Sequence, residues 1–184
     1  MSEPGLLYEA PELAASDPPR SFSAFALTPL PPVAQQGMKY LPWISFAVRC
    51  KACGGDDFRL GSRIEADPEL SRQAPSNPTL LRPPHRLKCE SCGAIETVFD
   101  PQTDGYDGVL SGGAGRQAVQ GEERFTKAVC KIELGATYNI DLEELKSLAA
   151  AAGPPVKATD LFDWINIIAT APDGEPLEVD YECA

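Results

Sequence analysis

Hydrophobic and polar residues alternate in several short stretches of the chain, and a period of two is typical of half-buried β-strands. The clearest stretch is 125–134, where Cys130, Ile132 and Leu134 alternate with charged residues. Short apolar runs rich in aromatic and β-branched residues predict further strands at 43–48, 58–64, 95–99, 162–169 and 177–181. The Pro172-Asp173-Gly174 segment between the last two runs is typical of a hairpin turn.

A helical pattern follows the strand at 125–134. Leu142, Leu145 and Leu148 recur at the spacing of one helix face, Asp141 stands at the position of an N-cap, and Gly153-Pro154-Pro155 ends the pattern. Together with the two strands beyond it, this helix predicts the order β-α-β-β for residues 122–184. We therefore expect an α+β fold that is mainly β.

Proline and glycine divide the chain into segments. Residues 1–42 contain eight prolines and no sustained hydrophobic period, which predicts an extended N-terminal arm before a module at 43–103. Residues 67–84 contain five prolines, too many for a central strand, and predict a long insertion in that module. Residues 104–121 contain six glycines and predict a flexible linker to an acidic α+β module at 122–184.

The N-terminal arm leaves two interpretations open. Its apolar residues Tyr8, Phe22, Phe25 and Leu27 can lie along a groove of this protein or of a partner. Alternatively, the arm is a loosely ordered tail.

Two segments of the chain share one cysteine pattern, Cys-x-x-Cys-Gly. The first contains Cys50 and Cys53, and the second contains Cys89 and Cys92. Two intervening residues let both thiolates of a pair face one ion, and the following glycine permits a tight turn with backbone N–H groups directed at sulfur. Paired Cys-x-x-Cys segments in a reducing compartment indicate a metal site rather than disulfides. We therefore predict that these four cysteines bind a metal ion.

On these two motifs, residues 43–100 resemble the four-cysteine zinc-ribbon family. The resemblance implies that Cys50, Cys53, Cys89 and Cys92 hold one structural Zn²⁺ between two short β-hairpins. Four thiolates complete a tetrahedral zinc site and leave no position for a catalytic water. The 35 residues between Cys53 and Cys89 exceed the usual spacing in such ribbons and accommodate the proline-rich insertion. A rubredoxin-like iron site is the alternative, although this sequence lacks the aromatic residues after the first pair and the proline inside the second that rubredoxins show.

The charge of the chain is unevenly distributed and bears on its partners. Of a net charge of −11, almost all lies in residues 100–184, which contain 16 acidic and six basic residues. An acidic surface repels nucleic acid, so this half favours a protein partner. Arg82, Arg86 and Lys88 with His85 form a small basic patch beside the second cysteine pair, which keeps nucleic-acid binding as an alternative.

Neither a membrane span nor a secretory signal is expected from the sequence. The chain contains no run of about 18 apolar residues. The first residues also lack the basic start and apolar stretch of a signal peptide. We expect a cytoplasmic protein.

The sequence contains no recognisable catalytic motif. We interpret His85 as a surface histidine, Cys130 as a buried strand residue, Cys183 as a terminal thiol and Trp164 as a core residue. The carboxylates, among them Glu143, Glu144, Asp160 and Asp163, occupy cap or surface-like positions.

The predicted function is that of a non-enzymatic zinc-binding adaptor with a protein partner. A zinc-ribbon nucleic-acid factor is the alternative. An iron electron carrier or an enzyme without a recognisable motif is third.

Overall fold

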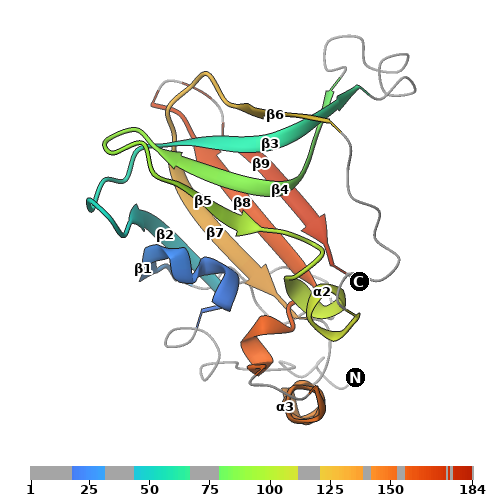
Figure 1. Ribbon diagram of the computed structural model, residues 1–184. Coiled ribbons are helices and arrows are strands. Elements are labelled where there is room, and N and C mark those ends of the chain that lie inside the picture. Colours follow the sequence, from blue (N-terminus) through green and yellow to red (C-terminus); the bar gives the residue numbers. More distant parts are fainter. Residues whose placement is uncertain are drawn as a thin grey trace, which may run out of the picture.

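The computed structural model describes the greater part of the chain. The described residues are 18–31, 44–66, 79–111, 121–138, 142–152, 156–172, 174 and 176–183. Within them the protein forms two antiparallel β-sheets that pack face to face, with helices mainly at one end (Figure 1).

The first sheet has five strands and combines residues from both halves of the chain. In spatial order its strands are β1 (Phe25–Pro29), β2 (Ile44–Cys50), β7 (Lys131–Thr137), β8 (Trp164–Thr170) and β9 (Leu177–Glu182). Every neighbouring pair is antiparallel. Phe46 on β2, Leu134 on β7 and Ile167 on β8 are buried and point toward the second sheet, as the period of two requires.

The second sheet has four strands. In spatial order these are β5 (Ile95–Phe99), β4 (Thr79–Cys89), β3 (Phe58–Ala66) and β6 (Glu122–Phe125). Leu60 on β3 and Leu87 on β4 are buried beneath the first sheet. Phe58 and Cys130 join the two sheets, because the N–H of each donates a hydrogen bond to the carbonyl of the other, at 2.9 and 2.8 Å.

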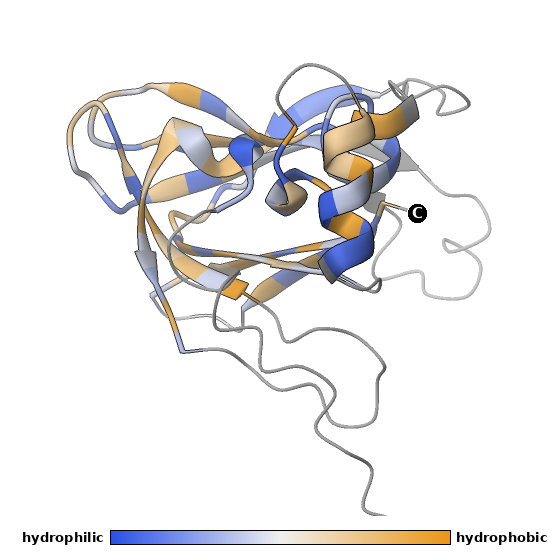
Figure 2. Cartoon of the chain, turned by 90° about the horizontal axis from the view of Figure 1, so that it is seen from below, coloured by the Kyte–Doolittle hydropathy of each residue, from blue (hydrophilic) through white to orange (hydrophobic). Residues whose placement is uncertain are grey.

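Among the described residues, short helices flank the sheets. They are the 3₁₀ helices η1 (Arg20–Ala24) and η2 (Ala158–Asp160) and the α-helices α2 (Gly105–Ser111) and α3 (Leu142–Ala151). Figure 1 shows α2 and α3 at the end of the sandwich opposite the turns that follow β2 and β4. Hydrophobic and hydrophilic residues alternate along the strands, as Figure 2 shows, so each sheet has an apolar face for the core.

The structure confirms the α+β, mainly β class and most of the expected strands. The order β7, α3, β8, β9 is the β-α-β-β order expected from the sequence. The stretch 125–134 is divided between the end of β6 and the beginning of β7, so it contains parts of two strands.

Part of the segment expected as an insertion is a strand, because β4 begins at Thr79. Residues 79–82 pair with β3 alone, and the pairing with β5 begins only at His85, so this part of β4 is paired on one side. Pro83 and Pro84 lie where the pairing with β3 is interrupted, between the pairs Gly61–Arg86 and Arg63–Arg82. A bulge removes the need for backbone N–H donors, and the strand therefore tolerates both prolines.

The described part of the N-terminal arm is docked, not loose. Phe22 is fully buried, with its ring 6.3 Å from that of Phe46 and 6.5 Å from that of Phe162. Phe25 is also buried and begins β1. Leu27 packs against the core, whereas Tyr8 lies outside the described residues.

The expected linker begins with the helix α2. A side chain at Gly108 would lie 2.9 Å from the backbone of Thr103, so glycine permits the helix to pack closely there. Residues 112–120 lie outside the described residues. The boundaries of the expected modules stay a prediction, but strands pair across them, since β2 pairs with β7 and β3 pairs with β6.

We predict that Phe22→Ala lowers the free energy of unfolding by about 3–5 kcal/mol, because it leaves a cavity between the rings of Phe46 and Phe162. Urea unfolding followed by tryptophan fluorescence measures this change. Ser23→Ala, at an exposed position of the same helix, is the matched control and should change stability by less than about 0.5 kcal/mol. Equal stability of the Phe22→Ala variant and the wild type would contradict the docking of the arm.

Candidate metal centre

Four cysteines from two distant segments meet at one end of the sandwich. Cys50 ends β2 in the five-stranded sheet, and Cys89 ends β4 in the four-stranded sheet. Cys53 and Cys92 lie on the turns that follow these strands. The four Sγ atoms all lie within 4.8 Å of one another, close enough to hold a metal ion.

The two turns have the same backbone geometry. In each, the N–H of the first cysteine donates to the carbonyl five residues later, and the N–H of the glycine donates to the carbonyl of the first cysteine. The bonds are Cys50 to Gly55 at 2.7 Å, Gly54 to Cys50 at 2.8 Å, Cys89 to Ala94 at 2.8 Å and Gly93 to Cys89 at 2.9 Å. Gly54 and Gly93 both have φ of 76°, a left-handed conformation that glycine adopts without strain.

The sulfur distances fit a tetrahedral site. Cys50 Sγ lies 3.7 Å from Cys92 Sγ, and Cys53 Sγ lies 3.6 Å from Cys89 Sγ. Metal–sulfur bonds of about 2.3 Å in a tetrahedron place sulfur atoms roughly 3.8 Å apart. A disulfide would require about 2.05 Å, and all four cysteines are free thiols in the structure. The donor set and its spacing therefore fit a thiophilic divalent ion.

Backbone N–H groups favour the thiolate at both Cys89 and Cys53, whereas neighbouring thiols lower the pKa of Cys89 and raise that of Cys53. Burial raises the pKa of Cys89, but the N–H groups of Cys92 and Ser91, together with the thiols of Cys53 and Cys92, outweigh it and lower that pKa from 9.0 to about 7. At Cys53 the N–H of Gly55 favours the thiolate, yet contacts with the Cys92 and Cys89 thiols raise the pKa from 9.0 to about 12. A bound cation would remove this competition for protons, because it takes the place of the protons on the sulfurs.

Ion pairs fix the ends of both turns to the rest of the fold. Arg59 on β3 donates to Glu90, beside Cys89, at 2.7 Å, and also to the carbonyl of Thr126 at 3.2 Å. After the first turn, Asp56 and Asp57 accept from Lys131 on β7 at 2.6 and 2.8 Å. Exposed pairs of this kind contribute little stability individually, so their main effect is on orientation.

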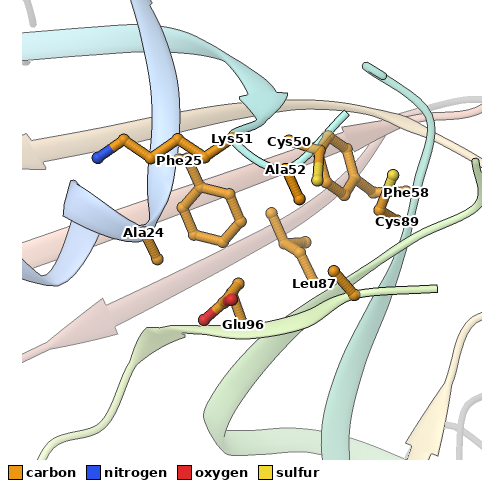
Figure 3. A pocket seen from close by; sticks show the side chains of 10 residues that line it. Ala24, Phe25, Cys50, Lys51, Ala52, Phe58, Leu87, Cys89 and Glu96 are labelled. Carbon is orange, nitrogen blue, oxygen red and sulfur yellow. The ribbon is translucent and has the colours of Figure 1, made fainter. Parts of the chain in front are cut away.

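A hollow of about 320 Å³ lies beside the cysteines (Figure 3). The edge strands β1 and β5 and the first turn enclose it, and Cys50 and Cys89 form part of its wall. The remaining lining is mostly apolar, with Lys51 and Glu96 as the charged members: Ala24, Phe25, Ala52, Phe58, Leu87 and Ala94. Lys51 donates to the carbonyl of Ser23 at 2.6 Å, whereas Glu96 forms no ion pair or hydrogen bond with the described part of the chain.

The interpretation of His85 as a surface histidine is wrong. Its side chain is fully buried between the sheets, where Nδ1 is hydrogen-bonded to Ser62 Oγ at 2.9 Å and the ring stacks on Phe99. Burial lowers its pKa from 6.5 to about 4, so the ring is neutral near pH 7. Ser62 is also buried, and no substrate can reach this pair without separation of the sheets. His85 faces the core and does not belong to the expected basic patch.

Other residues singled out in the sequence also lie in the core. Cys130 is buried as expected, and Cys183 is buried as well. Asp160 and Asp163 are buried and not at the surface, but Asp160 occupies a cap position, since its carboxylate accepts hydrogen bonds from the backbone N–H groups of Lys157 at 3.4 Å and Arg20 at 2.7 Å. Their role in this structure is to connect backbone segments.

Comparison with known proteins gives no relative: no protein-family model, no curated protein and no solved structure matches the chain. The fold and site together therefore define the class, a mainly β sandwich with a candidate four-cysteine metal centre at one end. Among the described residues, no helix has the length and apolar character needed to cross a membrane.

The buried state of His85 predicts an acid-sensitive fold. The unfolded chain binds a proton on this side chain below pH 6.5, whereas the folded protein resists protonation until about pH 4. Titration of His85 therefore leaves the free energy of unfolding unchanged above pH 6.5. As the pH falls from 6.5 toward 4, it lowers the free energy of unfolding by up to about 3 kcal/mol.

Urea unfolding of the wild type and His85→Gln at pH 7.5 and 4.5 measures this contribution. The decrease in unfolding free energy between the two pH values should be smaller in the variant, because glutamine does not titrate. Protonation of the four cysteines at low pH affects the wild type and the variant equally, so the difference between the two proteins excludes it. Parallel losses in the two proteins would assign the acid sensitivity elsewhere.

Proposed function

We propose that this protein is a non-enzymatic adaptor in which Cys50, Cys53, Cys89 and Cys92 hold one structural Zn²⁺, in a zinc-ribbon-like arrangement. The observation that carries the proposal is the approach of four sulfur atoms to within 4.8 Å of one another, with two of the separations, 3.6 and 3.7 Å, close to those of a tetrahedral site. A zinc ion with four thiolate ligands is closed to substrate and water, so its contribution is to stability rather than to catalysis. The free cysteines accord with a reducing, cytoplasmic location.

The position of the site supports a structural role. Since Cys50 and Cys89 end strands of different sheets, an ion bound to both would connect the two sheets at the end opposite α2 and α3.

A four-thiolate set also accepts iron. Zinc is the proposed ion because neither turn carries the aromatic or proline residues expected of an iron carrier.

The hollow beside the site supports a protein partner. It opens next to β5, an edge strand whose first three residues are exposed. An extended segment of a partner would pair with β5 and insert an apolar side chain in the hollow. The carboxylate of Glu96, which faces the same space in Figure 3, favours a basic residue next to that side chain.

We predict about one zinc per chain in the purified, colourless protein, measured by atomic emission spectrometry. Cys89→Ser should reduce bound zinc at least tenfold and lower the melting temperature, because the ion then loses a thiolate ligand. Cys183→Ser, at another buried cysteine outside the cluster, should retain full zinc content. Stoichiometric iron with visible absorption, or full zinc in Cys89→Ser, would refute the assignment.

Selection from a displayed library of random peptides tests the partner site. Enriched peptides should carry a large apolar residue beside Lys or Arg. Their affinity should fall about tenfold in Glu96→Gln, since a buried or half-buried charge pair contributes roughly 1.4 kcal/mol or more. Ala52→Trp, which fills the hollow, should abolish binding.

Glu144→Gln, at an exposed carboxylate of α3, provides the matched control and should bind as the wild type does. Peptides whose binding is unaffected by Glu96→Gln and Ala52→Trp would place the partner surface elsewhere. An increase in affinity on removal of residues 1–17 would show that the protein's own N-terminal segment competes for the hollow.

A further inference from the structure

The four cysteines of the candidate metal centre differ in their exposure. Cys53 and Cys92 are exposed on their turns, whereas Cys50 and Cys89 are buried, with 5% and 1% of their surface accessible. Figure 3 shows the two buried cysteines in the wall of the hollow. A dissolved oxidant therefore meets Cys53 and Cys92 first, because the oxidation of a cysteine depends on its exposure and its thiolate character.

Each exposed cysteine contacts a buried cysteine of the other segment. Cys92 Sγ lies 3.7 Å from Cys50 Sγ, and Cys53 Sγ lies 3.6 Å from Cys89 Sγ. A redox-sensitive cysteine is typically exposed and lies beside a second cysteine that resolves its oxidised form. The cluster contains two such pairs, and each pair joins the end of β2 or its turn to the end of β4 or its turn.

Contacts within the protein hold the two turns together. The backbone N–H of Glu90, on the second turn, donates to the carbonyl of Asp57, which follows the first turn, at 2.9 Å. A Cβ at Gly55 would lie 2.7 Å from Ser91 Oγ, so the absence of a side chain at Gly55 lets the turns approach closely. These contacts involve no bond to sulfur, so they favour the approach of the paired sulfurs with or without an ion.

The other two cysteines are less suited to oxidation. Cys130 and Cys183 are buried and lie outside the cluster. Burial raises the pKa of the Cys130 thiol, and this thiol therefore stays protonated near pH 7. Because the thiolate is the form that attacks an oxidant, we expect oxidation to be confined to the four clustered cysteines.

We propose that the cluster is an oxidative modification site, at which a peroxide converts the four thiolates to two disulfides, one between Cys50 and Cys92 and one between Cys53 and Cys89, and releases the ion. Release of the ion rests on the zinc site proposed above, whereas the choice of pairs rests on the sulfur distances. A disulfide sulfur has lost the negative charge with which a thiolate binds zinc. Disulfides in a reducing compartment are usually transient and redox-sensing, which fits a reversible modification.

The chemistry needs no reactant besides the peroxide. The thiolate of Cys92 attacks hydrogen peroxide, so an S–O bond forms, the O–O bond breaks and one hydroxide leaves. The thiolate of Cys50 then attacks the sulfur of this sulfenic acid, which forms the disulfide and releases a second hydroxide. Each pair of thiolates gives two electrons to one peroxide. The same steps at the second pair complete the oxidation, with Cys53 attacked first and Cys89 as the resolving thiolate.

The choice of pairs decides what happens to the fold when the ion leaves. A disulfide within one turn would leave the two sheets unconnected at this end, whereas both proposed disulfides connect β2 to β4. They also constrain the unfolded chain. The oxidised protein should therefore have a melting temperature several degrees above that of the reduced protein without metal. Since each disulfide contains one exposed sulfur, a dithiol reductant can attack it there and restore the thiolates.

Treatment of the full-length, zinc-loaded protein with hydrogen peroxide tests the proposal. A chromogenic chelator should record loss of all bound zinc, with about two peroxides consumed per zinc. The count of free thiols in denaturant should fall from six to two. Dithiothreitol and added zinc should restore both the thiols and the zinc content.

Mass spectrometry of the unreduced, digested protein identifies the pairs. Trypsin cleaves after Lys51, between Cys50 and Cys53, and a glutamate-specific protease cleaves after Glu90, between Cys89 and Cys92, so each cysteine lies on its own peptide. The expected linked peptides join Cys50 to Cys92 and Cys53 to Cys89.

A ligand exchange separates oxidation from zinc binding. Cys92→His keeps four zinc ligands, since three thiolates and one imidazole also form a tetrahedral site, but it removes one disulfide. This variant should bind about one zinc and form only the disulfide between Cys53 and Cys89 in peroxide. Cys183→Ser is the matched control outside the cluster and should lose zinc and form both disulfides as the wild type does.

Disulfides within a turn, oxidation to sulfonic acids without disulfides, or retention of zinc in excess peroxide would overturn the proposal while leaving the zinc site intact. A purified protein without zinc would refute the zinc assignment instead. In that case the peptide map of the peroxide-treated, metal-free protein still decides between the proposed pairs and pairs within a turn.

Discussion

The approach of four sulfur atoms at one end of the sandwich is the constraint on which the structure depends. It requires β2 and β4, which belong to different sheets, to end at the same place and to turn in the same way. The bridge between Phe58 and Cys130 joins the sheets beside it. At the other end the sheets are held by ring contacts such as Phe99 with Phe162, so the four-cysteine cluster and the aromatic packing lie at opposite ends of one core.

The local features of the fold could be predicted from the sequence, because their causes are local. Alternation identified most strands, and the repeated Cys-x-x-Cys-Gly pattern identified four residues that the structure brings within 4.8 Å. Strand partners could not be predicted in this way. The pairing of β2 with β7, more than 80 residues later, and not with β3, depends on the packing of whole sheets.

The errors also have physical reasons. Proline excludes a residue from a regular ladder, but a bulge in β4 removes the hydrogen bonds that Pro83 and Pro84 cannot make. His85 resembles a solvent-exposed residue next to two prolines and two arginines, yet it alternates inward with Leu87 and finds a polar partner in Ser62. In each case a contact with a distant strand determines where the residue lies. The sequence within ten residues contains no pattern that predicts this contact.

The interleaved strand order has a consequence for the order of events during synthesis. All four cysteines have been made once residue 92 leaves the ribosome, whereas the five-stranded sheet lacks its central strand until residue 137 follows. With an ion at the proposed site, a nascent chain would coordinate it before β5 to β9 exist. Such an ion would hold β2 and β4 together early, and the rate of synthesis would set the delay before β7 and β8 complete the sandwich.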